Sequence, residues 1–241
     1  MELAASLISS FAALLGAIAW PAAFLTALFI FRKPFRELLG RVRKGKVGFV
    51  EVELEHVALA TERTLDASGA ITVEQVHSAA RIEARAEDIG ETELLRQLDK
   101  LCLEYDALRR ALPPSNERTR AMTQVLVKMR SVGPSVMDSI NVYKGSGSPG
   151  STLAAIAMMQ MVPRRGDLNW LLNRFREPQP FIFYHAALAL TNIANTTSGH
   201  ERENVIDVAK RALEIVNEFD GVVDENTVSV LNSIIMADPR L

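Results

Sequence analysis

Residues 91–114, ETELLRQLDKLCLEYDALRRALPP, carry the pattern that decides the fold class of this chain. Large apolar side chains recur in this stretch every three or four residues, a spacing that places them on one face of an α-helix. The pair Pro113-Pro114 ends the helix, because proline lacks a backbone N–H and its ring clashes with the preceding turn. The stretch therefore predicts an amphipathic helix with an apolar face made of Leu94, Leu98, Leu101, Tyr105 and Leu108.

The same helical period continues to the end of the chain. Ser115 is placed to cap a second helix, which stops at Gly133-Pro134, and a shorter helix follows to about Tyr143. Residues 91–241 are therefore predicted to form an all-helical domain with short connections. The second helix is expected to bury Met122, Val125, Leu126 and Met129, and further helices are expected over residues 151–162, 167–176, 180–195, 202–218 and 225–236.

The segment AAIAM at residues 154–158 recurs 32 residues later as AALAL at residues 186–190. A second amphipathic helix and a proline turn lie between the two copies, so the weak 32-residue repeat spans residues 149–195. Small residues on a helix face, a partner helix and a repeat of this length are typical of stacked helical pairs. The pattern resembles HEAT and armadillo α-solenoids, and the resemblance implies a surface that binds other proteins. An irregular helical bundle would have a similar pattern.

Upstream of the helical domain, the segment VGFVEVELE at residues 47–55 alternates between two faces. Val50, Val52 and Leu54 share one face, and the other face carries mainly glutamates, which is the period of a β-strand. The chain has no second convincing strand pattern, so the same strand of another copy could satisfy its backbone N–H and C=O groups. The alternative is an extended linker that is solvated by water.

Residues 3–31 contain no charged side chain, and a basic cluster follows at once. About 20 apolar residues suffice to cross a bilayer core as a helix, and basic flanks stay on the cytoplasmic side. We therefore predict a single transmembrane helix in the plasma (inner) membrane, with the N-terminus outside and the rest of the chain in the cytoplasm. A cleaved signal peptide is the competing interpretation, but it would have a basic start and a shorter apolar run. The basic cluster, expected to contact anionic lipid heads, consists of Arg32, Lys33, Arg36, Arg41, Arg43, Lys44 and Lys46.

Four parts result: an anchor (1–31), a basic segment with a short strand (32–55), a polar helical spacer (56–90) and an all-helical domain (91–241). Within the spacer, Thr72-x-x-Gln75 resembles a capping box and predicts a helix from about residue 73 to 88. Charge is segregated, since residues 1–46 carry a net charge of +5 and the remainder carries −7, which sum to the formal −2. An acidic soluble part argues against nucleic-acid binding.

The densest group of polar side chains surrounds the turn at Pro113-Pro114. Arginines on two consecutive helices converge there and could hold a phosphate or a carboxylate through bidentate hydrogen bonds. Glu104, Asp106 and Glu117 are equally well placed to pair with these arginines, so we favour ion pairs that staple the corner and keep ligand binding as the alternative. The helices, Tyr-x-x-x-Arg and then Arg-Thr-x-x-Met, resemble helical modules of bacterial signalling and conflict proteins, which implies no particular activity. The candidate corner consists of Tyr105, Arg109, Arg110, Arg118 and Arg120.

No catalytic or metal-binding motif is recognisable. The four histidines have no metal-ligand spacing, and His185 is interpreted as a packing or capping residue. Cys102 is the single cysteine, and its place on the apolar helix face predicts a core residue. The glycine-rich residues 145–150, GSGSPG, lack the lysine of a phosphate-binding loop and predict a flexible connector. We therefore expect no cofactor, no metal and no enzymatic activity.

These expectations favour a membrane-tethered adaptor, scaffold or regulatory protein. Its expected partners are the lipid bilayer, another protein and a second copy of the chain, and nucleic acid is not expected. The alternatives are an oligomerising membrane effector of a bacterial defence or toxin system, and an enzyme without a recognisable motif.

Overall fold

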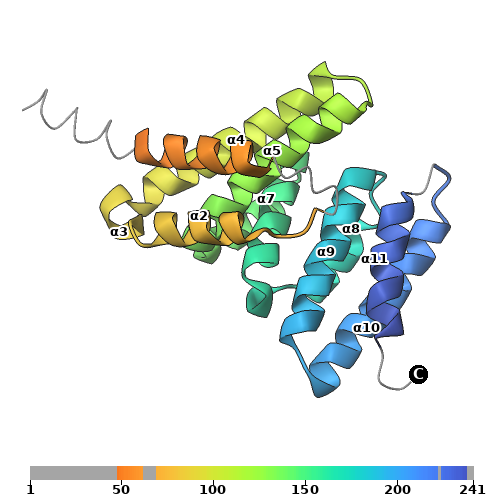
Figure 1. Ribbon diagram of the computed structural model, residues 1–241. Coiled ribbons are helices and arrows are strands. Elements are labelled where there is room, and N and C mark those ends of the chain that lie inside the picture. Colours follow the sequence, from red (N-terminus) through yellow and green to blue (C-terminus); the bar gives the residue numbers. More distant parts are fainter. Residues whose placement is uncertain (1–47, 62–68, 222–223, 238–241) are drawn as a thin grey trace, which may run out of the picture. The chain divides into compact units, whose positions relative to one another are not determined.

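The computed structural model describes residues 48–61, 69–221 and 224–237, and every regular element in these ranges is a helix (Figure 1). The all-α class is therefore confirmed for the described part of the chain. Phe49–Leu241 form a compact unit. The elements are a helix over residues 48–61, α2 (Val73–Glu83), α3 (Ala86–Ile89), α4 (Glu91–Ala111), α5 (Asn116–Val132), η1 (Gly133–Ser139), α6 (Ile140–Gly145), α7 (Pro149–Met161), η2 (Pro163–Arg165), α8 (Leu168–Arg174), α9 (Pro180–Thr196), α10 (Gly199–Asn217) and α11 (Glu225–Met236).

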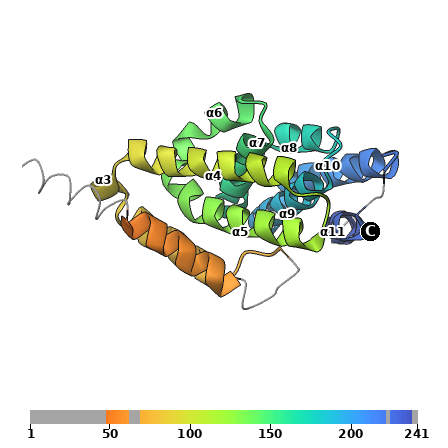
Figure 2. The ribbon, with the colours of Figure 1, turned by 90° about the horizontal axis from the view of Figure 1, so that it is seen from above.

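Helices α4 and α5 form the expected hairpin and run side by side (Figure 2). Leu94 and Leu126 have no exposed surface, and the other side chains predicted for the two apolar faces are buried or packed against the core. The Ser115 Oγ accepts a hydrogen bond from the Arg118 backbone N–H at 3.1 Å and so caps α5. The helical period of residues 91–132 therefore predicted both the elements and their buried faces.

The segment predicted to be a strand is helical instead, as part of residues 48–61. Val50, Leu54 and Val57 are buried at spacings of four and three, whereas Val52 is 70 % exposed. Val52 thus lies on the solvent side of a helix, and the alternation that it completes is accidental. The strand prediction was wrong, and pairing of this strand between two copies loses its basis.

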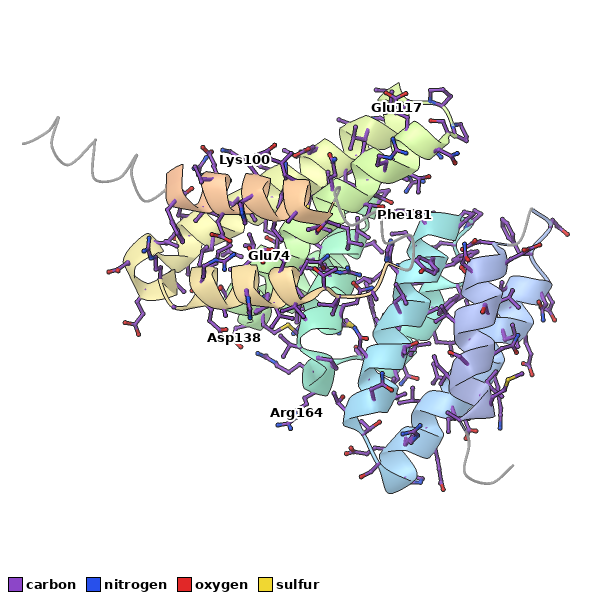
Figure 3. The ribbon with its side chains drawn as sticks, viewed as in Figure 1. Glu74, Lys100, Glu117, Asp138, Arg164 and Phe181 are labelled. Carbon is purple, nitrogen blue, oxygen red and sulfur yellow. The ribbon has the colours of Figure 1, made fainter. Side chains whose placement is uncertain are left out.

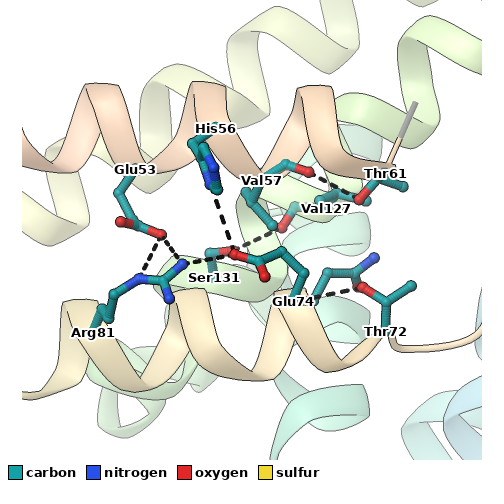
Figure 4. Close-up of polar contacts among 10 residues, drawn as sticks. Glu53, His56, Val57, Thr61, Thr72, Glu74, Arg81, Val127 and Ser131 are labelled. Carbon is teal, nitrogen blue, oxygen red and sulfur yellow. Dashed lines mark hydrogen bonds and ion pairs between the residues drawn. The ribbon is translucent and has the colours of Figure 1, made fainter. Parts of the chain in front are cut away.

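The helix over residues 48–61 runs antiparallel to α2, and the two are joined by an ion-pair cluster (Figure 4). Arg81 Nη2 lies 2.7 Å from Glu53 Oε1 and 2.8 Å from Glu74 Oε1. His56 Nδ1 lies 3.7 Å from Glu74 Oε1. The Arg81 side chain is 43 % exposed, so water screens these pairs and they contribute less than the apolar contacts between the helices.

Helix α2 belongs to the body of the unit. Its N-cap is the predicted one, since the Thr72 Oγ1 accepts a hydrogen bond from the Gln75 N–H at 3.3 Å. The helix ends at Glu83, before the predicted residue 88, and α3 follows as a separate turn. Its buried face, which includes Ala79 and Ile82, packs against α5. The stretch that we interpreted as a spacer thus contributes to the core.

Helix α7 lies at the centre of the unit and packs against α4, α5, α6 and α9. All of its residues from Gly150 to Gln160 are buried, which explains why this sequence shows no polar face. The two copies of the weak repeat lie in α7 and α9, and these helices contact each other. The alanines of both copies are fully buried and allow a close approach. Membership of the HEAT and armadillo class stays a prediction.

The predicted connector at residues 145–150 is shorter than expected, because its last residues belong to α7. Ser148 caps this helix, and Gly150 lies at its first turn. The Gly150 N–H donates to Asp106 Oδ1 on α4 at 2.8 Å. A Cβ atom on Gly150 would lie 2.8 Å from the carbonyl carbon of Cys102 and 2.9 Å from its Cα. Cys102 itself is buried, as predicted, and burial raises the pKa of its thiol to about 12.

Among the described helices, none combines the length and apolar character that a bilayer crossing requires. The predicted anchor at residues 1–31 and the basic cluster at residues 32–46 lie outside the described residues. The transmembrane and orientation assignments therefore stay predictions.

Candidate functional site

A cavity of about 750 Å³ lies where the tip of the α4–α5 hairpin meets the starts of α9 and α11. Figure 3 labels Glu117 at the hairpin tip and Phe181 at the start of α9. The lining residues come from α4, from the first half of α5, from residues 178–185 and from the beginning of α11, together with Thr61 and Gly69. Segments that are more than one hundred residues apart in sequence thus meet at one site.

The structure brings four of the five predicted corner residues into this cavity. Tyr105 and Arg109 of α4 line it together with Arg118 and Arg120 of α5. Arg110 is exposed and does not line it. Four of the five residues therefore share one cavity, and their role in binding stays a prediction.

The ion pairs expected to staple this corner do not form within the described residues. Glu104 and Glu117 are exposed, and neither makes an ion pair with a described arginine. The Asp106 carboxylate instead accepts the hydrogen bond from the Gly150 N–H. The ion pairs of the stapling interpretation are therefore not found in the part of the chain that the structure describes, where the Asp106 carboxylate joins α4 to α7 instead.

Two of the cavity arginines donate hydrogen bonds to uncharged acceptors instead of pairing with a carboxylate. Arg109 Nη1 donates to the Gln179 Oε1, and Arg118 Nη1 donates to the Leu112 carbonyl at 3.2 Å. The Arg118 Nε is buried and has no hydrogen-bond partner in the described structure. Within the same part of the chain, Arg120 has neither an ion pair nor a hydrogen bond. Three guanidinium charges therefore share one cavity, and none of them has a carboxylate partner among the described residues.

The carboxylate found among the described lining residues belongs to Asp224, and it is already used. Its oxygens accept hydrogen bonds from the Asn226 N–H at 3.3 Å, the Thr227 N–H at 3.3 Å and the Thr227 hydroxyl at 2.8 Å. Asp224 is thus the N-cap of α11 and stabilises that helix. It does not form an ion pair with the arginines across the cavity.

Three helices begin at the cavity. Asn116 of α5, Pro180 of α9 and Asn226 of α11 all line it and lie within the first turn of their helices. The N-terminus of a helix carries a partial positive charge and unpaired N–H groups. No side chain caps α9, so its first N–H groups are not satisfied by a capping oxygen. The uncapped start of α9 therefore adds to the positive potential that the arginines create, whereas the Asp224 carboxylate offsets the start of α11.

A chain of aromatic rings forms another wall of the cavity. The Tyr105 and Phe181 ring centroids lie 6.0 Å apart, and Phe181 lies 4.5 Å from His185. His185 lies in turn 5.1 Å from Tyr184. All four residues line the cavity, and Phe181 and Tyr184 are only partly buried. The guanidinium carbon of Arg109 lies 5.9 Å from the centroid of the Tyr105 ring, so the arginines and the aromatic rings adjoin each other there.

A buried polar network lies behind this wall. Arg130, which is 2 % exposed, donates to the Gln160 Oε1 at 2.7 Å, to the Gln75 Oε1 at 3.0 Å and to the Gly69 carbonyl at 2.8 Å. The Gln160 Nε2 donates to the His185 carbonyl at 2.7 Å. Burial lowers the pKa of Arg130 to about 10, so the guanidinium stays charged at neutral pH. Its charge has no carboxylate partner in the described structure and adds to the potential of the cavity.

Sequence reasoning missed this network and the part of the site that α9 and α11 contribute. A signal was present for Arg130, because it follows Leu126 by four residues and so falls on the predicted core face of α5. A charged residue at such a position must find internal hydrogen bonds. No local signal indicated that Phe181 and Asn226 would meet the arginines, because this depends on how distant helices pack.

Tyr105 and His185 are held in their neutral forms in the cavity. Burial raises the pKa of Tyr105 to about 12. Burial, helped by the positive charge of Arg130, lowers the pKa of His185 well below its usual 6.5. His185 is 2 % exposed, and its Nδ1 has no hydrogen-bond partner among the described residues. The arrangement is suited to binding an anion by fixed positive charges, and neither group titrates near pH 7.

We expect the free energy of unfolding to fall with pH below about 6.5, with a slope to which His185 contributes, because its pKa in the folded state lies well below the ordinary value. The unfolded chain binds a proton on this imidazole below its ordinary pKa, whereas the folded state keeps it neutral. The contribution of the neutral His185 to stability is therefore present above the ordinary pKa of histidine and is lost as the pH falls. Urea unfolding at several pH values should show this slope, and His185→Phe should reduce it. The exposed His200 provides the control, since His200→Gln should leave the slope unchanged.

Comparisons with family models, with curated proteins and with solved structures found no match to this chain. Within the described residues, no group of three or more histidine, cysteine, aspartate or glutamate side chains could hold a metal ion. The function must therefore be argued from the cavity itself.

Proposed function

We propose that this protein is a membrane-tethered regulatory module whose helical unit binds an anionic ligand in the cavity between the α4–α5 hairpin and α9. The observation that carries the proposal is the set of three lining arginines, Arg109, Arg118 and Arg120, that have no carboxylate partner in the described structure. The uncapped N-terminus of α9 acts in the same direction.

The energetic argument concerns uncompensated charge. Like charges that share a cavity repel each other, and a buried guanidinium N–H without a hydrogen-bond partner loses solvation without a replacement. An anion in the cavity would supply both the missing charge and the missing acceptors, and guanidinium groups bind phosphate or carboxylate in a bidentate manner. The Arg118 Nε, which is buried and unpartnered in the described structure, is one group that such a ligand would satisfy.

The tether rests on the sequence at residues 3–46. A charge-free run followed by seven basic residues is the pattern of a single-pass anchor with its helical unit on the cytoplasmic side. An anchored receptor is confined to a thin layer at the membrane, where its effective concentration toward other membrane-bound partners is raised. Binding of the ligand would then change which partners the helical unit engages.

The test uses the full chain in a neutral detergent at low salt, where screening is weak. Inorganic triphosphate at about 100 times its dissociation constant stabilises a folded protein by about 2.7 kcal/mol, which corresponds to a rise in Tm of about 5 to 10 °C for a unit of this size. Arg118→Ala and Arg120→Ala should each weaken triphosphate binding by about tenfold or more. Arg120→Ala is the cleaner variant, because Arg120 makes no hydrogen bond in the described structure.

Arg110→Ala is the matched control. Arg110 and Arg120 are both exposed and carry the same charge, but Arg110 does not line the cavity. Its triphosphate affinity should equal that of the unchanged protein. An absence of stabilisation by triphosphate, or an equal loss of affinity in Arg110→Ala and Arg120→Ala, would contradict the proposal.

A further inference from the structure

The cavity is larger and less uniformly polar than an inorganic anion requires. A phosphate ion occupies the space of a few water molecules, each of about 30 Å³, whereas this cavity has a volume of about 750 Å³. That volume is typical of pockets that hold organic ligands. The lining arginines come from α4 and α5, whereas the rings of Phe181 and Tyr184 come from α9. A ligand that fits must therefore carry an apolar, planar part as well as negative charge.

From this two-sided chemistry we infer that the ligand is a nucleoside phosphate, with its phosphates at the arginines and its base against the aromatic wall. The inference rests on the proposed anion site and names its ligand class. Arg118 and Arg120 at the start of α5 and the uncapped N-terminus of α9 bind the phosphates. The half-buried Phe181 and Tyr184 offer ring surface on which a nucleobase stacks.

The aromatic wall is preorganised for this task. The Phe181 ring contacts Tyr105 at 6.0 Å and His185 at 4.5 Å between centroids, and these two neighbours restrict its motion. Helix α9 carries Phe181 and Tyr184 in its first turns, next to the same N-terminus that faces the phosphates. One helix start thus provides both the aromatic and part of the anionic contacts. The distance between the two parts of the ligand is set by a rigid element.

Polar groups that could recognise the edge of a base lie at the same site. The side-chain amide of Gln124 lines the cavity and makes no hydrogen bond in the described structure. An amide both donates and accepts, as the edge of a nucleobase requires. The buried His185 Nδ1, which also lacks a partner there, is a further group that a polar ligand atom could satisfy. A simple acyl chain would use none of these groups.

The experiment measures the affinity of the full chain in neutral detergent for ATP, GTP, inorganic triphosphate, adenosine and dodecyl phosphate by calorimetry. We expect at least one nucleotide to bind about tenfold or more tightly than inorganic triphosphate, because stacking adds to the phosphate contacts. Adenosine alone should bind weakly. Phe181→Leu, which keeps an apolar side chain but removes the ring, should reduce nucleotide affinity to about that of inorganic triphosphate and leave triphosphate binding unchanged.

Phe219→Leu is the matched control, because Phe219 packs against Phe183 and does not line the cavity. Its nucleotide affinity should be unchanged. If Phe181→Leu does not fold, saturation-transfer NMR on the unchanged protein replaces it, and the base protons of the nucleotide should then receive the strongest transfer. Base protons that receive less transfer than the ribose protons would overturn the inference.

The outcomes separate this inference from the proposed function. Equal affinity for nucleotides and inorganic triphosphate would overturn the nucleoside assignment and leave the anion site intact. Tighter binding of dodecyl phosphate than of any nucleotide would also overturn it, in favour of a lipid phosphate. Failure of every phosphate compound to bind would refute both the nucleoside assignment and the anion site.

Discussion

Replacing Gly150 by alanine is expected to lower the free energy of unfolding by about 3 kcal/mol or more. The new Cβ would lie 2.8 Å from the carbonyl carbon and 2.9 Å from the Cα of Cys102, and both are backbone atoms of α4. Backbone atoms cannot turn away as the end of a flexible side chain can, so α4 and α7 must separate. Separation would also lengthen the hydrogen bond from the Gly150 N–H to Asp106.

Helix propensity alone predicts that Gly150→Ala raises the free energy of unfolding. Gly150 lies in the first turn of α7, where alanine would be favoured over glycine by up to about 1 kcal/mol. Gly145 is the matched control, since it lies at the end of α6 and a Cβ there would meet no atom within 4 Å. Gly145→Ala should leave stability unchanged or raise it slightly. Denaturant unfolding followed by circular dichroism measures both variants, and equal stabilities would show that α4 and α7 do not approach closely at Gly150.

The helical period predicted the elements that carry large apolar side chains. Leu94 and Leu126 lie on the buried faces that their spacing indicates. Residues that are three or four apart lie on the same side of a helix, and that side packs against the core. The period failed at residues 48–61, where Val52 happens to complete an alternation. A longer window would have included Val57, which is buried seven residues after Val50 and follows the helical period.

The site was predictable only where it is local in sequence. Arg109 and Arg118 lie on either side of one short turn, so their convergence follows from the hairpin. Their lack of carboxylate partners in the described structure was not predictable, because the hydrogen bond from Gly150 occupies Asp106. Phe181 reaches the cavity through the contacts of α9 with α7 and α11. Such placement depends on the tertiary arrangement, which no local spacing encodes.

Replacing the buried Arg130 is expected to reverse the usual order of conservative and non-conservative substitutions. Arg130→Met should lower the free energy of unfolding by about 2 kcal/mol, and Arg130→Lys by about 4 kcal/mol. Methionine leaves the Gln160, Gln75 and Gly69 acceptors unpaired, but it removes a charge that has no carboxylate partner in the described structure. Its flexible side chain also fills most of the same space.

Arg130→Lys is expected to be the more destabilising variant, because lysine keeps the positive charge but cannot reproduce the hydrogen bonds of the guanidinium. A guanidinium donates to three acceptors in one plane, whereas an ammonium on a shorter stem is a compact, strongly hydrated charge that cannot reach all three. The measurement is denaturant unfolding of both variants at neutral pH. Arg164→Met is the control, because Arg164 is exposed, and it should change stability by no more than about 0.5 kcal/mol. If Arg130→Lys proves more stable than Arg130→Met, then the positive charge itself stabilises this core, and a negative group outside the described residues must compensate it.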